Sequence, residues 1–456
     1  MSTKRESFTN RIGFVLAAAG SAIGLGNLWR FPFLVAQKGG GIFILAYVIF
    51  AFTFGLSLLI TEITIGRKTR QSSVGAYKAV HPKFGFLGVL TALVPIIILP
   101  YYGVIGGWVT KYGFDYLIGR GGEIAANSQA HFNSFISMQE SGLLNNVEFF
   151  FFLYLAATAC IVLLGVQKGI EKASKILLPV LIVLTIGIIL YTFTIPGVTQ
   201  GLKYYFLPDF SFIKSFKDLA DLMLSALGQL FYSLSLSMAI MITFGSYMKE
   251  EDDIHAASLQ IVILDSIVAI FAGLMIVPPV VAFHGGDPSL VNAGPGLMFV
   301  TLPQVFANMP GGNFVGAAFF VLVFFAALTS SISLMEAVAS IFMDLFKMQR
   351  KNATIAIFVL SLALGTLSCL GYGPLSFIQF AGMAFLDFFD FLTNSIMMPI
   401  IAICTCLLIG HVVTPKYVKN EVKLSGDLKA EGIYNAMLRW ISIPILSAIL
   451  LSNVIS

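Results

Sequence analysis

A stretch near the amino terminus combines polar and helix-breaking residues inside an apolar run long enough to cross a bilayer. Residues 20–33 read GSAIGLGNLWRFPF and include three glycines, an asparagine, an arginine and a proline. Unpaired backbone groups are costly in hydrocarbon, so such a break is tolerated only where the freed groups face protein, water or a ligand. Freed carbonyls can hold a cation, and freed amides at the start of a second half-helix can hold an anion. The stretch therefore predicts a binding site, although a packing kink would use the same residue types.

A second break is predicted near the middle of the chain. The run SALGQLFYSLSLSMAIMITF places Ser233, Ser235 and Ser237 at every second position of an otherwise apolar segment. On a continuous helix these hydroxyls would spread around the cylinder and some would face lipid, so an unwound stretch explains them better. Two interrupted segments at corresponding positions are typical of an inverted repeat with a binding site at the membrane midplane.

The composition places the chain among integral membrane proteins. Of its 456 residues, 57% are hydrophobic and 11% are charged, and the mean hydropathy is +0.90, whereas soluble domains carry about 25% charged residues. The five histidines form no cluster, and no nucleophile stands at motif spacing from a base. We therefore expect neither an enzyme nor an enzymatic cofactor. The net charge of +4 is spread over loops, and no nucleic-acid partner is expected.

Apolar stretches of about 20 or more residues recur along the chain and predict eleven membrane-spanning helices. They cover residues 11–35, 41–66, 88–118, 149–166, 170–194, 219–247, 255–284, 314–346, 353–371, 380–410 and 433–454. The fourth and fifth stretches could also be one long hairpin around residues 165–169. Because no loop is long enough for a soluble domain, residues 1–456 are expected to form one transmembrane domain. Its repeats would cover about 11–194 and 219–410, with an extra helix at about 433–454.

The basic residues predict the orientation, because cytoplasmic loops carry an excess of lysine and arginine. With the N-terminus in the cytoplasm, 20 of the 27 basic residues fall on the inner side. An odd number of spans then places the C-terminal Ser456 outside.

Six blocks of sequence resemble the neurotransmitter:sodium symporter family. They are GSAIGLGNLWRFPF, GGGIF at 39–43, TEITIGR at 61–67, GQLFYSLS at 228–235, TLP at 301–303 and FFAALTSSIS at 324–333. Their order matches the family, and the chain is similar to its short eleven-span bacterial members. The resemblance implies an all-α integral membrane protein of the cell (inner) membrane with the leucine-transporter fold. This fold is a 5+5 inverted repeat in which helices 1 and 6 are unwound at the midplane.

The resemblance also implies two co-transported Na⁺ ions, and sodium is a hard cation that takes oxygen ligands. One site would consist of the carbonyls of Gly20, Ile23 and Ala326 with the hydroxyls of Thr329 and Ser330. The other would consist of the Ala22 carbonyl, the Asn27 side chain, Ser233 and Asp265. On residue type alone, Thr329 and Ser330 could equally be hydroxyls that pack helices together.

An amino-acid substrate is implied between the two breaks. Its carboxylate would meet the amides of Leu25 and Gly26, the Tyr102 hydroxyl and the second sodium ion, and its ammonium would face the carbonyls of Ala22, Tyr232 and Ser233. Relatives that carry monoamines have an aspartate at the position of Gly24, so this chain implies a zwitterionic substrate. An apolar and aromatic pocket implies a hydrophobic or aromatic L-amino acid, with a lining of Ile98, Tyr102, Tyr232, Ser235, Met238, Ser330 and Leu334.

Charged pairs are expected on both sides of the site, because an unpaired charge within a membrane is costly. Arg30 and Asp390 match the outer gate of the family, and Arg5 and Asp344 match the inner gate. The leading hypothesis is a sodium-coupled amino-acid symporter that works by alternating access. The alternative is an amino-acid-binding receptor or channel-like protein without coupled transport.

Chloride independence is the last expectation, and it depends on Asp265. Tyr47, Gln229 and Ser233 match chloride ligands of chloride-dependent relatives, but Ala269 replaces the remaining serine and Asp265 replaces an asparagine. A fixed carboxylate can offset the sodium charge that chloride offsets elsewhere.

Overall fold

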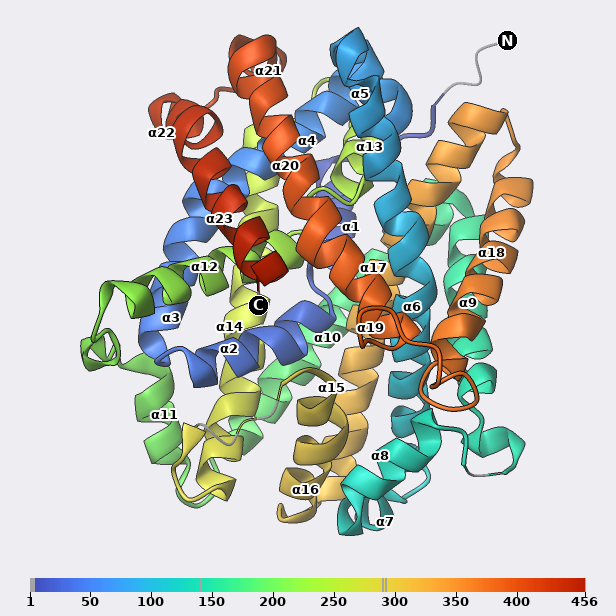
Figure 1. Ribbon diagram of the computed structural model, residues 1–456, viewed down its shortest axis with the longest axis vertical. Helices are drawn as coiled ribbons and strands as arrows, with labels where there is room; N and C mark the ends of the chain where they lie inside the picture. The colour runs from blue at the N-terminus through green and yellow to red at the C-terminus, as the bar shows by residue number, and fades with distance from the viewer. Residues whose placement is uncertain (1–4, 140, 289–290, 292, 456) are drawn as a thin grey trace.

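The structure, a computed structural model, describes residues 5–139, 141–288, 291 and 293–455 and is almost entirely helical (Figure 1). By length and composition, eight of the described helices can cross a membrane, and one bent pair makes a ninth. The apolar helix α9 (Val147–Leu163) and the broken pair α12 (Phe216–Ser233) and α13 (Ile240–Tyr247) occupy the two remaining predicted spans. Every predicted span therefore corresponds to a helical segment.

The first ten spans form two sets of five. The first set is α1 (Arg11–Ala22) with η1 (Gly26–Arg30) and α2 (Phe31–Gln37); α3 (Gly41–Phe50) with η2 (Ala51–Gly55) and α4 (Leu56–Thr69); α6 (Gly85–Leu117); α9; and η5 (Val166–Glu171) with α10 (Lys172–Thr192). The second set is α12 with α13; α14 (Ile254–Phe283); α17 (Gly312–Phe346); α18 (Arg350–Leu370); and α19 (Phe385–Asp390) with η9 (Phe391–Met397), α20 (Met398–Leu407) and η10 (Leu408–Val412). The eleventh span is α22 (Glu431–Ala436) with η11 (Met437–Ile441) and α23 (Ser442–Ile455).

Short helices cover the two ends of the bundle. At the top of Figure 1, near the N-terminus, lie α5 (Ser73–Val80) and α21 (Lys416–Val422). At the bottom lie α7 (Gly121–Ala126), α8 (Ser128–Ile136), α15 (Gly294–Gly296) and α16 (Leu302–Ala307), and α11 (Val198–Phe206) lies on the lower left. We call these the N-terminal end and the loop end.

The first helix is broken at residues 23–25. The side chain of Asn10 accepts a hydrogen bond from the Gly13 amide at 2.9 Å and so caps the start of α1. Ile23 is extended, with ψ of 99°, which ends α1 at Ala22. The chain direction then changes by 53° before η1 and α2 continue. The break predicted from the glycines and the asparagine is present.

The sixth span is broken at residues 234–239. Ser235, Ser237 and Ala239 have φ of 52°, 63° and 62°, a left-handed conformation that an L-residue cannot continue into a helix. The Ser237 amide donates a 2.7 Å hydrogen bond to the carboxylate of Glu62 on α4, which is 1% exposed. The Glu62 carboxylate thus accepts the hydrogen bond that a backbone carbonyl would accept from the Ser237 amide in a continuous helix.

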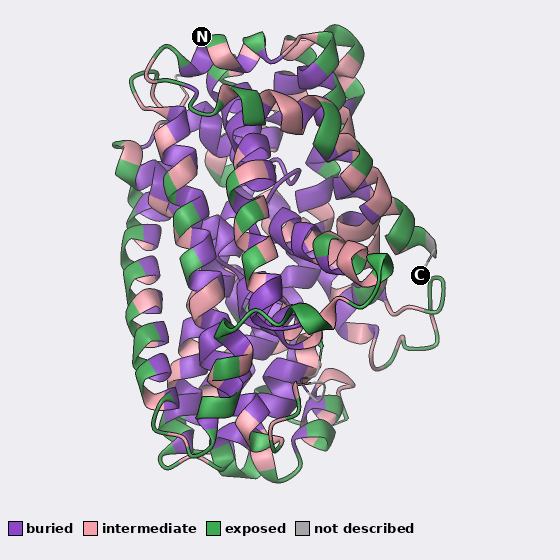
Figure 2. Cartoon of the chain, turned by 90° about the vertical axis from the view of Figure 1, so that its left-hand side faces the viewer, coloured by how far each residue is buried: buried purple, intermediate pink, exposed green. Residues whose placement is uncertain are grey.

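Both broken helices lie at the centre of the bundle. The most apolar windows of α14 and α17 are 72% and 78% buried, against 33% for the span containing α10 and 39% for α18. Figure 2 shows the buried residues along the middle of the molecule and the exposed ones at its edges. Since α1 packs on α14 and α17, and α13 packs on α4 and α17, continuous helices enclose both breaks.

The start of the tenth span differs from the sequence expectation. The tenth span begins at Phe385 and not at residue 380, because residues 371–384 form turns and Gly382 has φ of 78°. The fourth and fifth spans are separate helices, as in the predicted eleven spans, and they are joined by a tight turn in which Gly165 has φ of 84°.

Candidate functional site

A small cavity lies between the two breaks. Its volume is about 30 Å³, and fifteen residues line it: Ser21, Ala22, Gly24, Leu25, Gly26, Asn27, Ile98, Tyr102, Tyr232, Ser233, Ser235, Met238, Ile240, Ser330 and Leu334. These include all eleven residues expected at the substrate. Leu25 and Tyr102 meet directly, because the Leu25 amide points at the Tyr102 hydroxyl at 3.5 Å. The cavity therefore combines backbone polar groups at the breaks with an apolar wall from α6, α17 and residues 238–240.

Oxygen atoms from the end of α1 and from α17 gather beside this cavity around Ser330. The Ser330 hydroxyl lies 3.0 Å from the Ser21 carbonyl, 3.2 Å from the Ala326 carbonyl and 3.5 Å from the Ile23 carbonyl. The Thr329 hydroxyl lies 3.0 Å from the same Ala326 carbonyl. Gly20 lies against Thr329, since a Cβ atom added at Gly20 would be 3.4 Å from the Thr329 Cβ. The five residues expected at the first sodium ion are thus neighbours, and uncharged oxygens of this kind suit Na⁺.

A buried carboxylate forms the second cluster. Asp265, on α14, accepts hydrogen bonds from Asn27 Nδ2 at 2.8 Å, from the Ser233 hydroxyl at 2.9 Å and from the Tyr47 hydroxyl at 3.0 Å. The Asn27 Oδ1 atom accepts from the Gly24 amide at 3.1 Å. Among the described residues no basic side chain pairs with Asp265, and a buried carboxylate without a positive partner is costly. The cluster is therefore chemically suited to a cation.

At the N-terminal end, Arg5 joins α13 to α17. Its guanidinium forms an ion pair with Asp344 at 2.7 Å and donates to the hydroxyls of Ser340 at 2.7 Å and Ser246 at 2.9 Å. Phe8 is fully buried behind this group, with its ring centroid 5.6 Å from that of Phe244. The two residues expected as the inner pair are in contact.

Toward the loop end, the expected outer pair is not in contact. In the described part of the chain no ion pair joins Arg30 to Asp390. The Arg30 guanidinium lies 5.7 Å from the centre of the Tyr232 ring, and Asp390 accepts hydrogen bonds from Asn394 at 2.6 Å and Tyr101 at 3.2 Å. Arg30 and Asp390 both line a second cavity of about 390 Å³, and Tyr232 lines this cavity and the small one. Tyr232 therefore stands between the two spaces.

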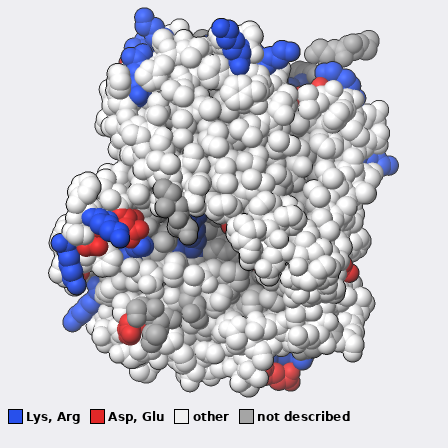
Figure 3. Space-filling view, in the orientation of Figure 1, with Lys and Arg blue, Asp and Glu red and all other residues white. Residues whose placement is uncertain are grey.

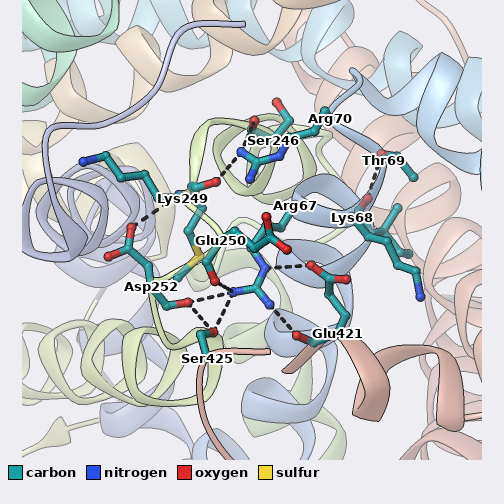
Figure 4. A network of polar contacts seen from close by, with 12 residues as sticks. Arg67, Lys68, Thr69, Arg70, Ser246, Lys249, Glu250, Asp252, Glu421 and Ser425 are labelled. Carbon is teal, nitrogen blue, oxygen red and sulfur yellow. Dashed lines mark hydrogen bonds and ion pairs between the residues drawn. The ribbon is translucent and has the colours of Figure 1, made fainter. Parts of the chain in front are cut away.

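At the N-terminal end of the bundle, a buried arginine joins three segments (Figure 4). Arg67, at the end of α4, has no exposed side-chain surface and pairs with Glu421 of α21 at 2.9 Å. It also donates to the Asp252 carbonyl at 2.7 Å and to the Ser425 hydroxyl at 2.8 Å. Asp252 lies in the connection between α13 and α14, so this side chain ties that connection to α4 and α21.

Arg67→Met is expected to lower the free energy of unfolding by about 3–5 kcal/mol, because removing one partner of a buried pair leaves the Glu421 charge uncompensated. Lys68→Met is the matched control. Lys68 is exposed and contacts the Tyr417 ring, an interaction worth about 0.5–1 kcal/mol. Chemical unfolding of the purified protein in detergent measures both. Equal effects of the two substitutions would contradict the assigned role of Arg67.

Comparison with known proteins decides the family. The model of the sodium:neurotransmitter symporter family matches residues 5–120 and 125–456. The chain belongs to this family. A sodium-dependent transporter of Bacillus subtilis (YhdH) is 34% identical, over 92% of this chain and 90% of that protein. A sodium-dependent transporter of Methanocaldococcus jannaschii is 30% identical, over 97% of this chain and 89% of that protein.

A solved structure decides the fold of this sodium:neurotransmitter symporter. The crystal structure of MhsT in complex with L-phenylalanine matches with a TM-score of 0.86 at 36% identity, over 99% of this chain and 100% of that one. The predicted family and the predicted leucine-transporter fold are confirmed. The protein is a sodium-dependent, multi-pass membrane transporter and not an enzyme.

Some residues at the centre of the symporter were not found from the sequence. Ser21 and Ile240 line the small cavity, and Glu62 holds the second break. Ser21 lies inside the first predicted break, and this position could have indicated that it lines the cavity. Glu62 lies in the TEITIGR block, and a carboxylate within an apolar span is itself a signal of function.

Proposed function

We propose that the protein is a sodium-coupled symporter that imports a hydrophobic or aromatic L-amino acid by alternating access. The observation that carries this proposal is the small cavity, which joins the backbone at Leu25 and Gly26 to an apolar wall. Gly24 leaves no carboxylate in the cavity to pair an amine, so a substrate that carries its own carboxylate fits best. The complex of MhsT with L-phenylalanine supports the same class of substrate.

Two Na⁺ ions are proposed as the coupling ions. One would be bound by Gly20, Ile23, Ala326, Thr329 and Ser330, and the other by Ala22, Asn27, Ser233 and Asp265. Ala22, Asn27 and Ser233 of the second cluster line the small cavity, so we propose that the substrate carboxylate completes the second site. An ion beside the substrate explains how the sodium gradient would be coupled to uptake.

The size of the small cavity requires a movement when substrate binds. A space of about 30 Å³ holds roughly one water molecule, which is far less than an aromatic side chain. Tyr232 separates this space from the cavity of about 390 Å³ toward the loop end. We propose that displacement of Tyr232, with Arg30 stacked on it, admits the substrate. Arg30 with Asp390 and Arg5 with Asp344 are proposed as the outer and inner gates.

The proposed location is the cell (inner) membrane, with the N-terminus in the cytoplasm and the C-terminus outside. The ion pair between Arg5 and Asp344 then closes the cytoplasmic side, and the larger cavity opens to the outside. Residues 1–456 are proposed to act as one transmembrane domain.

Accumulation of labelled amino acids in proteoliposomes tests the proposed function. An inward sodium gradient is expected to drive phenylalanine, leucine or tryptophan above the external concentration, and an equal potassium gradient is expected to fail. Binding of the amino acid without accumulation in either gradient would favour the receptor or channel-like alternative.

Chloride independence is proposed on the basis of Asp265, and one double substitution tests it. Asp265→Asn with Ala269→Ser removes the fixed charge and adds a hydroxyl one helical turn further along α14, so uptake is expected to require chloride. The measurement is uptake in chloride and in gluconate. Ala269→Ser alone is the control and should transport equally in both anions. Loss of wild-type uptake in gluconate, or a double variant that ignores the anion, would contradict the proposal.

A further inference from the structure

An apolar groove runs along the side of the bundle, away from the substrate cavity. Its volume is about 280 Å³, and none of its lining residues has a polar side chain: Ile42, Leu45, Ala46, Ile49, Phe50, Phe210, Ile213, Leu219, Leu222 and Met223. The α3 residues have helical spacing, so one face of α3 forms one wall. One face of α12 forms the other wall, and the connection before α12 closes one end.

The connection that closes the groove exposes large apolar side chains. Leu207, Phe210 and Phe216 are 62%, 66% and 85% exposed, an arrangement that water disfavours and a membrane interface favours. On the groove wall, Leu45 and Ile49 of the predicted second span are 45% and 53% exposed. The groove therefore opens onto lipid and not onto water.

Charged residues adjoin the groove lining along the chain, and one of them, the acidic Asp218, accepts a hydrogen bond from the Lys214 amide at 3.0 Å. Lys214 follows the lining residue Ile213, and Lys217 lies two residues before the lining residue Leu219; both lysines are exposed. Figure 3 shows basic and acidic side chains gathered at the left-hand edge, at the level of this connection, below an almost uncharged surface. Among the described residues Lys217 forms no ion pair. A basic group at the end of an apolar groove complements a phosphate head group above an acyl chain.

We propose that the groove between α3 and α12 binds one acyl chain of a phospholipid, with the lipid phosphate at Lys214 and Lys217. The same helix α12 carries Tyr232 and Ser233 at its other end, where they line the small cavity. A lipid in the groove packs against the outer face of this helix and stabilises it in the position seen here. This site lies outside the substrate and sodium sites and does not depend on the proposed substrate.

Photolabelling of the full-length protein in nanodiscs tests the site. The probe is phosphatidylglycerol or phosphatidylethanolamine with a diazirine on one acyl chain, and mass spectrometry of peptides locates the labels. We expect labels concentrated in residues 42–50 and 210–223. Ala46→Trp fills the groove and should reduce this labelling about tenfold, the loss expected when about two methylene groups leave an apolar site.

Matched variants make the result specific. Ala156→Trp places the same ring on α9, outside the groove, and should leave the labelling unchanged. Met223→Trp fills the groove from α12 and replaces Ala46→Trp if that variant does not fold. Lys214→Gln with Lys217→Gln should reduce labelling by both phospholipids but not by an alkyl diazirine without a phosphate.

Three results would overturn the proposal. Labelling spread evenly over the lateral surface, or unchanged by both groove-filling variants, would show that the groove is not a binding site. Equal labelling by phospholipid before and after loss of both lysines would show that the phosphate is not recognised there. A difference between the two phospholipids would identify the preferred head group and support the proposal.

Discussion

Gly24→Asp is expected to abolish amino-acid binding. A carboxylate at this position would lie beside the proposed position of the substrate carboxylate, and two like charges about 4 Å apart repel by about 4 kcal/mol at an effective dielectric constant near 20. That energy corresponds to roughly a thousandfold loss of affinity. Titration calorimetry, or competition against a labelled amino acid, measures the loss in sodium buffer.

Steric crowding at Gly24 would also lower the affinity for the amino acid, and this effect must be separated from the effect of charge. A Cβ atom at Gly24 would lie 2.7 Å from the Ser330 hydroxyl oxygen and 3.2 Å from the Tyr102 hydroxyl oxygen. Any side chain there crowds the cavity, so Gly24→Asn is the matched control with the same shape and no charge. The affinity difference between the Asp and Asn variants reports the repulsion. Equal affinities of the two would show that the substrate carboxylate does not lie near Gly24.

The second large effect is expected from Thr329→Ala combined with Ser330→Ala. This change removes two of five proposed oxygen ligands from one sodium ion, and the carbonyls of Gly20, Ile23 and Ala326 are left to bind it alone. Sodium-driven uptake is expected to fall at least about a hundredfold, because hydrogen bonds and ion contacts of charged groups contribute about 1.5–3 kcal/mol each. The initial rate of uptake as a function of sodium concentration measures the change.

Ser330 also lines the substrate cavity, so single variants are needed beside the double one. Thr329→Ala alone removes a proposed ion ligand that does not line that cavity. Thr329→Ser keeps the hydroxyl and should retain most of the uptake. If the double variant folds, as judged by gel filtration, and keeps the wild-type sodium affinity, the two hydroxyls are packing groups and the site is wrong.

The residue types at the two helix breaks made much of the central binding region predictable from the sequence. Glycine, asparagine and alternating serines inside apolar runs are costly in a membrane unless the helix opens, so both breaks followed from the sequence. The family resemblance then assigned eleven residues that the fold does bring around one cavity. The tenth span was predicted five residues too early, because hydropathy continues through residues 380–384 while Gly382 turns the chain.

Other contacts could not be predicted, because their partners lie far apart along the chain. Glu62 reaches Ser237 and Arg67 reaches Glu421 across 175 and 354 positions. No local pattern encodes such a pair. A charged residue in an apolar span indicates that a partner exists but does not identify it. The groove between α3 and α12 could not be predicted for the same reason. In the sequence each wall looks like an ordinary lipid-facing helix surface, and only the fold brings the two walls together.

The contacts on the two sides of the small cavity respond differently to salt. Toward the N-terminal end stands the ion pair of Arg5 and Asp344, whose side chains are 18% and 30% exposed. Toward the loop end stands the ring of Tyr232. Raising the ionic strength from about 0.15 M to 1 M shortens the Debye length from about 8 Å to 3 Å, which weakens a partly exposed ion pair but hardly affects an aromatic ring. If Arg5 and Asp344 act as the proposed inner gate, raising the salt concentration is therefore expected to favour opening on the Arg5 side.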